Sequence, residues 1–223
     1  LYERLADADQ AKLRDHLKVF LAEKTFTGCG GQEITDEVRV TIGAHACLLL
    51  LHRETEYYPD LDEILVYPHA YRAKGERQQD NGVVSEGDSL RLGESWLRGP
   101  VVLAWDAVKA GFYDVRDGGN VAIHEFAHQL DQEDGRADGA PPLGERARYA
   151  PWARVLSKEF ERLRSARDKG RKTLLDTYGA TNPAEFFAVV SETFFERPKT
   201  LLKKHPELYA QLSAYYQQDP AET

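Results

Sequence analysis

Three residues stand out for their type and spacing, because His124, Glu125 and His128 form the pattern HExxH. An α-helix has 3.6 residues per turn, so two histidines four residues apart lie on one face and can bind the same metal ion. The surrounding segment 121–130 is largely apolar, which indicates burial, and buried imidazoles without partners are costly. The pattern predicts a zinc site with His124 and His128 as ligands and Glu125 as general base. The alternative is a helix whose two histidines are only solvated or capped.

A third ligand is needed, because catalytic zinc usually takes three protein ligands and leaves one position for water. Asp134 is a weak candidate, at the place of the third histidine in HExxHxxGxxH. Glu185 and Glu192 are better ones, because they lie seven residues apart in an apolar run and share one helical face. The residues alone do not choose between them. With Asn182 as N-cap and Pro183 after it, Glu185 could instead close a capping box.

Other acidic residues are poorer candidates for the metal. Glu133 follows the motif too closely to turn back, and Glu159 and Glu161 lie in a strongly charged stretch where exposure to solvent is expected. His45 is predicted to be a core or boundary histidine rather than a ligand.

The elements that must position these residues follow from periodicity and from turn residues. Before the motif helix we expect an amphipathic helix over 5–21, a buried helix over 38–51 capped by Thr35, and strands at 64–67, 83–92 and 99–106. After the motif helix we expect a charged helix over 152–169, an apolar helix through 195 that Pro198 ends, and a last helix over 206–216. Together they predict one α+β domain over 1–223, with a helical part (1–60), a small sheet (61–110) and the helices of the metal site (118–223).

Composition limits the partners and the compartment. A net charge of −8 argues against binding to nucleic acid or to an anionic membrane surface, both of which need a positive field. The only cysteines, Cys29 and Cys47, are too few for a disulfide framework, which favours a reducing cytoplasm. The longest apolar stretch is shorter than the roughly 20 residues of a membrane span.

Two blocks of the chain carry a family resemblance. His124–Asp131, which reads HEFAHQLD, and Tyr178–Ala188, which reads YGATNPAEFFA, resemble the Mlc titration factor A (MtfA) family of bacterial zinc metallopeptidases. Both blocks are also similar to the catalytic domain of anthrax lethal factor. The MtfA resemblance extends through segments 23–28, 93–96 and 99–106 and so covers most of the chain, with region 135–177 matching least.

The resemblance implies a zincin-like fold, one zinc ion per chain and a peptide or protein substrate. It places the third zinc ligand on Glu185 and a catalytic tyrosine on Tyr178, which would donate a hydrogen bond to the oxyanion. It also implies a possible partner, because members of the family bind the glucose-responsive transcriptional repressor Mlc. A protein-binding regulator that sequesters Mlc with little catalytic role is therefore the rival hypothesis. Retention of Glu125 favours catalysis, while the choice between aminopeptidase and endopeptidase action stays open.

Two residue-level expectations remain. Asp131 lies seven residues after His124 on the same helical face, where it either holds an imidazole N–H or acts as a helix-end carboxylate. The strand at 101–105 is either a sheet edge that adds an extended peptide or an ordinary core strand. For Tyr178 the alternative to a catalytic role is a core tyrosine ahead of a turn.

Overall fold

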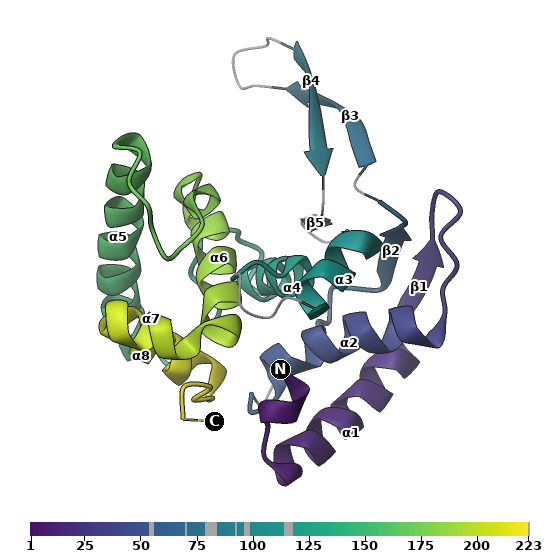
Figure 1. Ribbon diagram of the computed structural model, residues 1–223, viewed down its shortest axis with the longest axis horizontal. Helices are drawn as coiled ribbons and strands as arrows, with labels where there is room; N and C mark the ends of the chain where they lie inside the picture. The colour runs from purple at the N-terminus through teal and green to yellow at the C-terminus, as the bar shows by residue number, and fades with distance from the viewer. Residues whose placement is uncertain are drawn as a thin grey trace.

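The computed structural model describes residues 1–53, 56–69, 71–78, 84–91, 93–95, 99–113 and 118–222. Helices and strands both contribute, so the expected α+β class is confirmed (Figure 1). The helices are η1 (Tyr2–Arg4), α1 (Asp7–Glu23), α2 (Asp36–Leu50), α3 (Trp105–Tyr113), α4 (Val121–Asp131), α5 (Arg146–Asp168), η2 (Thr177–Ala180), α6 (Pro183–Glu196), α7 (Pro198–Lys204) and α8 (Pro206–Tyr216). The strands are β1 (Thr25–Gly28), β2 (Glu63–Tyr67), β3 (Tyr71–Gln78), β4 (Val84–Arg91), β5 (Gly93–Ser95) and β6 (Val101–Ala104).

The main sheet has the order β1-β2-β6-β5. β1, β2 and β6 are parallel, and β5 runs antiparallel to β6. All four residues of β6 are buried, which agrees with its apolar sequence VVLA. Because β6 has a partner on each side, the hypothesis that it is a free sheet edge is wrong, and the core-strand alternative is correct. The antiparallel edge belongs to β5 instead.

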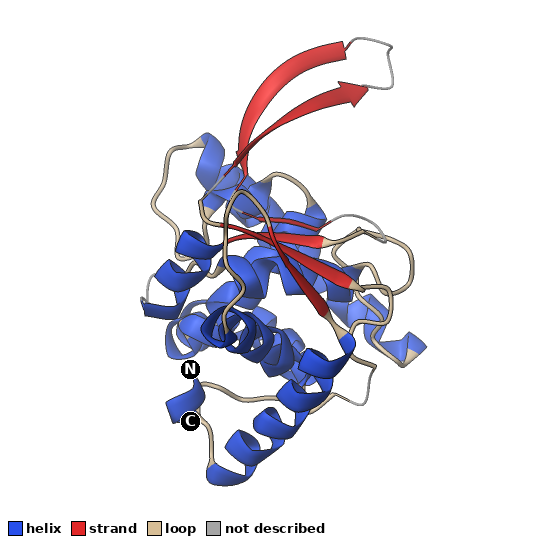
Figure 2. Cartoon of the chain, turned by 90° about the vertical axis from the view of Figure 1, so that its right-hand side faces the viewer, coloured by secondary structure: helices blue, strands red, loops and turns tan. Residues whose placement is uncertain are grey.

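β3 and β4 form a separate two-stranded antiparallel ribbon that extends away from the other elements (Figure 2). β4 lies within the strand expected at 83–92, whose end residues are outside the described part. β3 was not foreseen, because its sequence YRAKGERQ is polar and lacks the apolar alternation that indicates a half-buried strand.

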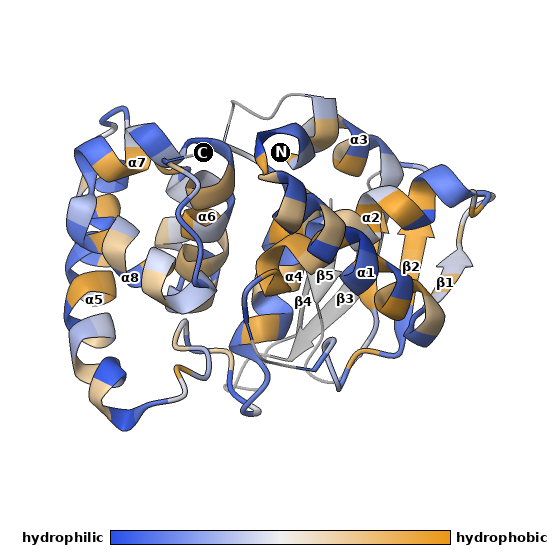
Figure 3. Cartoon of the chain, turned by 90° about the horizontal axis from the view of Figure 1, so that it is seen from below, coloured by the Kyte–Doolittle hydropathy of each residue, from blue (hydrophilic) through white to orange (hydrophobic). Residues whose placement is uncertain are grey.

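The helix that carries HExxH lies centrally in the molecule. α4 is flanked by α2 and the sheet on one side and by α6 on the other (Figure 1). Apolar residues concentrate along α2, α4 and β2, as the colouring in Figure 3 shows. Phe126 of α4, for example, is fully buried and contacts the rings of Phe20 and Tyr58. α4 is thus held by packing on several sides, which fixes the direction of its polar face.

Several helix boundaries differ from the expectations. α5 begins at Arg146, six residues earlier than expected, and contains Pro151 in its second turn. Pro198 ends α6 as expected, but it also begins α7, because proline is well accommodated at the first position of a helix. The strand expected at 99–106 stops at Ala104, and Trp105 begins α3.

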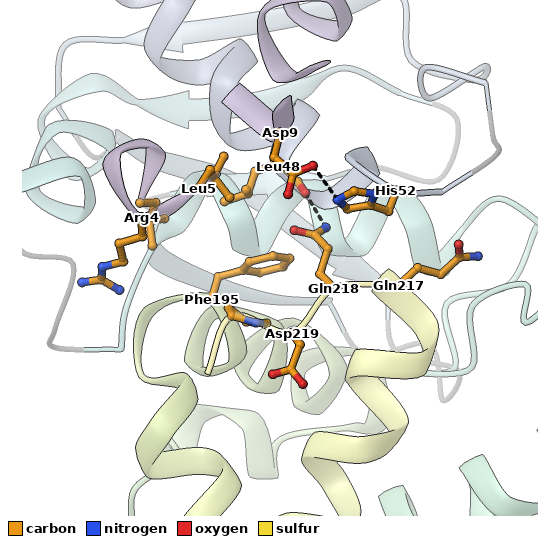
Figure 4. A pocket seen from close by; sticks show the side chains of 11 residues that line it. Arg4, Leu5, Asp9, Leu48, His52, Phe195, Gln217, Gln218 and Asp219 are labelled. Carbon is orange, nitrogen blue, oxygen red and sulfur yellow. Dashed lines mark hydrogen bonds and ion pairs between the residues drawn. The ribbon is translucent and has the colours of Figure 1, made fainter. Parts of the chain in front are cut away.

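The two ends of the described chain meet near α2. His52, just after α2, pairs with Asp9 at 3.0 Å, and the Gln218 side chain donates to the carbonyl of Leu48 at 2.8 Å (Figure 4). These contacts join the segment after α8 to the N-terminal helices. Among the described residues, none of the helices combines the length and apolar composition that crossing a membrane requires.

Candidate metal centre

α4 presents its histidines on one face because its start is fixed by a cap. The Asn120 side chain accepts a hydrogen bond from the Ile123 N–H at 3.1 Å, which begins the helix at Val121. His124 and His128 then lie one turn apart, with ring centroids 4.8 Å from each other. Glu125 lies beside them and is only 4% exposed.

α6 brings a carboxylate to the same point. Asn182 caps this helix by accepting from the Glu185 N–H at 2.9 Å, and Pro183 occupies the first turn. The capping-box alternative for Glu185 is wrong, because its side chain faces the imidazoles. Its Oε2 lies 3.0 Å from His124 Nε2 and 3.4 Å from His128 Nε2.

The three side-chain atoms form a compact triangle suited to a metal ion. The third edge, between the Nε2 atoms of His124 and His128, is 3.2 Å. Ligands at 2.0–2.1 Å from a tetrahedral zinc ion are separated by about 3.3 Å, so the observed edges fit zinc. In the described part of the chain, these residues are the one group of three or more His, Cys, Asp or Glu side chains arranged to hold a metal.

Charges at the site also favour a cation. Burial acts to lower the pKa of His124, but hydrogen bonds with Glu185 and Glu192 outweigh it and hold the pKa well above its usual value. Burial likewise acts to raise the pKa of Glu185, yet hydrogen bonds with both imidazoles hold it well below its usual range. The carboxylates thus need positive charge at this point, which a divalent ion supplies more fully than a proton does.

Glu125 is a buried carboxyl group beside the two histidines. Burial raises the pKa of its carboxyl to about 8, against the opposing effect of His124. Its Oε2 is buried and has no hydrogen-bond partner within the described part of the structure. A buried carboxylate oxygen without a partner is rare, and a water or substrate group at the metal would provide one.

Glu192 contacts the His124 ring at Nδ1, the nitrogen that does not face Glu185 and His128. Its Oε1 lies 2.7 Å from His124 Nδ1, and its Oε2 accepts from the Asn120 N–H. The same carboxylate therefore orients one imidazole and holds the first turn of the helix that carries it. One turn later on α6, Glu196 accepts from the Asn120 side chain at 3.1 Å and from the Gly118 N–H at 3.0 Å.

The sequence predicts Asn120 as the cap of the motif helix, which is confirmed, but the interpretation missed Glu196 and the contacts of Glu192 and Glu196 with Asn120. Glu192 and Glu196 are four residues apart in an apolar helix, and that spacing could have shown that both point to one partner element. Both carboxylates are buried, and they fasten α6 to the start of α4.

Asp131 acts as a helix-end carboxylate and not as a support for an imidazole. Its Oδ2 accepts from the Gly139 N–H at 2.9 Å. Gly139 has a φ of 76°, and a Cβ there would lie 2.4 Å from the Pro183 carbonyl oxygen, so only glycine fits. Asp131 thereby holds the loop after α4 against the start of α6, two residues before Glu185.

Tyr178 lies at the rim of the site. Its side chain is 55% exposed, which contradicts the core-tyrosine alternative. Its ring centroid is 6.1 Å from that of His124. The Asp176 side chain accepts from the Tyr178 N–H at 2.8 Å and begins the short helix η2 that presents the ring.

The remaining candidate carboxylates lie elsewhere. Asp134 is exposed and accepts from the Arg136 N–H, and Glu133 faces Arg53 at 3.6 Å. Glu159 was expected to be exposed, but it is 5% exposed and bonds His205. His45 is buried with its Nδ1 2.8 Å from the Thr41 carbonyl, as expected of a core histidine.

Comparisons with known proteins also point to a metal ion. Residues 1–217 match the model of the family described as glucose-regulated metallo-peptidase M90. The chain is 44% identical to an uncharacterized protein of Synechocystis sp. over 98% of its own length and 80% of that protein. It is 35% identical to Mlc titration factor A of Serratia proteamaculans and 34% identical to Mlc titration factor A of Klebsiella pneumoniae (strain 342). These two alignments cover 99% and 97% of the chain and 84% and 82% of the relatives.

Proposed function

Since this chain belongs to the glucose-regulated metallo-peptidase family M90, we propose that it is a zinc-dependent peptidase with a zincin-like fold. The observation that carries the proposal is the triangle formed by His124, His128 and Glu185, beside the buried Glu125 carboxylate, whose Oε2 has no hydrogen-bond partner among the described residues. A set of two histidines and one glutamate is a known zinc-hydrolase ligand set, and it leaves one coordination position open. We therefore expect one zinc ion per chain.

The proposed reaction is hydrolysis of a peptide bond. His124, His128 and Glu185 would hold the zinc ion, which would supply polarisation of the scissile carbonyl and lower the pKa of a bound water towards about 7. Glu125 takes a proton from the attacking water and passes it to the leaving amine. Tyr178 donates its phenolic hydrogen bond to the oxyanion, and its exposed position at the rim lets it meet a substrate. Glu192 holds His124 in the orientation in which Nε2 faces Glu185 and His128, where a metal ion would bind.

An extended substrate has a place to bind beside α4. β5 is the edge strand of the main sheet, and it packs against α4. An added peptide strand along β5 would form main-chain hydrogen bonds there and lie next to the candidate metal ligands. This assignment replaces β6, which has a partner on both sides.

The test combines metal analysis with digestion of a peptide library. The wild-type protein should bind one zinc ion and cleave peptides, and Glu125→Gln should keep the zinc and lose hydrolysis by about 10³-fold or more. Glu161→Gln is the matched control, because Glu161 is exposed and pairs with Arg164 on its own helix. Full turnover in Glu125→Gln, or a protein that binds no zinc, would refute the proposal.

A second candidate function rests on the names of the relatives. Because relatives at 34–35% identity are called Mlc titration factor A, we propose binding of the repressor Mlc in the cytoplasm as an added role. Titration of purified Mlc with wild-type protein and with Glu125→Gln separates the two functions. Equal binding by both proteins, without peptide cleavage by wild type, would favour a regulator with little catalytic role.

A further inference from the structure

We infer that a cleft between α5, the segment 171–175 and the α7–α8 junction binds a small organic anion with at least two negative charges, such as a phosphate ester or a dicarboxylate. We call it the basic cleft. It is built from residues on three separate stretches of chain, of which Arg162, Arg171, Lys172, Lys204, Glu159 and His205 carry the argument. None of them belongs to the candidate metal centre.

The shape of the basic cleft suits a small molecule. Its volume is about 520 Å³, within the roughly 300–1,000 Å³ that is usual for ligand pockets. Leu163 and Leu175, both 3% exposed, supply apolar lining for the body of such a ligand. A charged patch on a flat helix face would lack this concavity and this apolar component.

The charges in the cleft are unbalanced. Four cationic side chains line it, namely Arg162, Arg171, Lys172 and Lys204, against the single carboxylate of Glu159. That carboxylate is already engaged, because its Oε2 lies 2.7 Å from His205 Nδ1 and its Oε1 lies 3.5 Å from Arg162.

The remaining cations are available to a ligand. Within the described residues, no carboxylate forms an ion pair with Arg171, Lys172 or Lys204, although the chain as a whole carries a charge of −8. Like charges gathered in a concave site repel one another and focus a positive potential there. A dianion relieves this repulsion, whereas a neutral ligand does not.

The cleft lies next to the segment that leads to the metal centre. Segment 171–175 continues into Asp176, which caps η2 and so helps to place Tyr178. At the other end of η2, Arg167 of α5 donates to the Ala180 carbonyl at 2.9 Å. An anion in the basic cleft would therefore contact the same stretch of chain that presents Tyr178.

The test is calorimetric titration of the zinc-loaded protein with phenyl phosphate and, separately, with isophthalate at constant ionic strength. Each probe combines two negative charges with an apolar ring and chelates zinc weakly, and zinc content is measured before and after each titration. Saturable one-to-one binding of either probe supports the inference. The stronger of the two identifies the anionic group that the cleft prefers.

Variants locate the binding. Arg171→Gln with Lys204→Gln removes one cation from each side of the cleft, and both residues are exposed, so the fold should persist. Affinity should fall by about tenfold or more. The control pair Lys12→Gln with Arg146→Gln changes the net charge equally at exposed positions outside the cleft and should change affinity by less than about threefold. Should the Arg171/Lys204 pair unfold, Lys172→Gln alone provides the same comparison.

Three results would overturn the inference. One is the absence of saturable binding of both probes at concentrations up to about 10 mM, a range that detects even weak sites. Another is equal weakening by the cleft pair and the control pair, which would show only a long-range charge effect. The third is binding of a polyglutamate peptide but of neither small anion, which would make the surface a site for acidic protein segments.

Discussion

In the described part of the chain, two buried glutamates each pair with a histidine at the same separation. Glu192 meets His124 at 2.7 Å, and Glu159 meets His205 at 2.7 Å. Each glutamate is less than 10% exposed, and each pair joins two helical regions, α6 to α4 in one case and α5 to the α7–α8 junction in the other. Judged by the pair alone, the two places are equivalent.

The difference lies in what surrounds the second ring nitrogen. His124 Nε2 faces His128 and Glu185, so three potential ligand atoms converge. Around His205 the lining of the basic cleft is cationic, and a metal ion there would meet repulsion. The comparison shows that a buried glutamate–histidine pair can serve a metal or serve packing. The convergence of further ligands decides which role applies.

The largest difference between the two pairs should appear in zinc affinity when the third candidate ligand, Glu185, is removed. Glu185→Ala should lower zinc affinity by about 10³-fold or more, because two imidazoles alone form an incomplete site. Glu159→Ala, at the other pair, should leave zinc content unchanged. Zinc retained in Glu185→Ala and lost in Glu192→Ala, measured by metal analysis after dialysis, would move the third ligand to Glu192.

Tyr178 provides the next test, because an exposed tyrosine lies beside His124, whereas no tyrosine lines the basic cleft beside His205. Tyr178→Phe keeps the ring and removes the hydroxyl. If that hydroxyl meets charge only in the transition state, kcat and kcat/KM should both fall by roughly 10², with KM and zinc content nearly unchanged.

Tyr149→Phe serves as the control, since Tyr149 is also exposed and its hydroxyl accepts from the Leu143 N–H. A loss of less than about threefold in Tyr178→Phe would leave oxyanion stabilisation to other groups. A rise in KM with an unchanged kcat would instead assign Tyr178 to substrate binding.

Zinc affinity should depend on the charge of Glu192, which pairs with His124, but not on the charge of Glu159, which pairs with His205. Glu192→Gln keeps a side chain of the same size but weakens the hold on His124 Nδ1, so zinc affinity should fall by about 10- to 100-fold. Glu159→Gln should leave zinc affinity within about twofold of wild type. A competitive chelator titration measures both, and equal effects would show that the two pairs act alike.

The sequence predicted the candidate metal ligands more fully than it predicted the residues that hold those ligands in place. HExxH fixed His124, Glu125 and His128 because a helical period alone brings them together. Glu185 and Glu192 were equal candidates on residue patterns, because seven residues place both on one face of α6. Only the packing of α6 on α4 shows that Glu185 reaches the Nε2 atoms while Glu192 reaches His124 Nδ1.

Elsewhere local patterns failed where tertiary contacts decide. Glu159 lies among charged residues, so its burial depends on His205, 46 residues away, which no local pattern reveals. The strand at 101–104 was identified, but its place inside the sheet depends on pairing with the distant β2 and with β5. Helix α7 was missed because Pro198 was interpreted as an end and not also as a start.

The smallest expected effect concerns the pH dependence of stability at the second pair. Burial acts to raise the pKa of Glu159, but the hydrogen bond from His205 and nearby cations hold it below its usual value of 4.5. A carboxyl with a lowered pKa stabilises the folded state above pH 4.5, and that contribution is lost as the pH falls through its folded-state pKa. At pH 7, Glu159→Gln should therefore unfold about 1 to 2 kcal/mol more easily than wild type. The difference should shrink as the pH is lowered from 7 to below 4.5 and through the folded-state pKa of Glu159, because the side chain at this position then becomes neutral in both proteins. Urea unfolding of the two proteins across this range measures it, with Glu161→Gln as the exposed control. A difference that stays constant with pH would show that shape and packing, and not charge, account for the burial of Glu159.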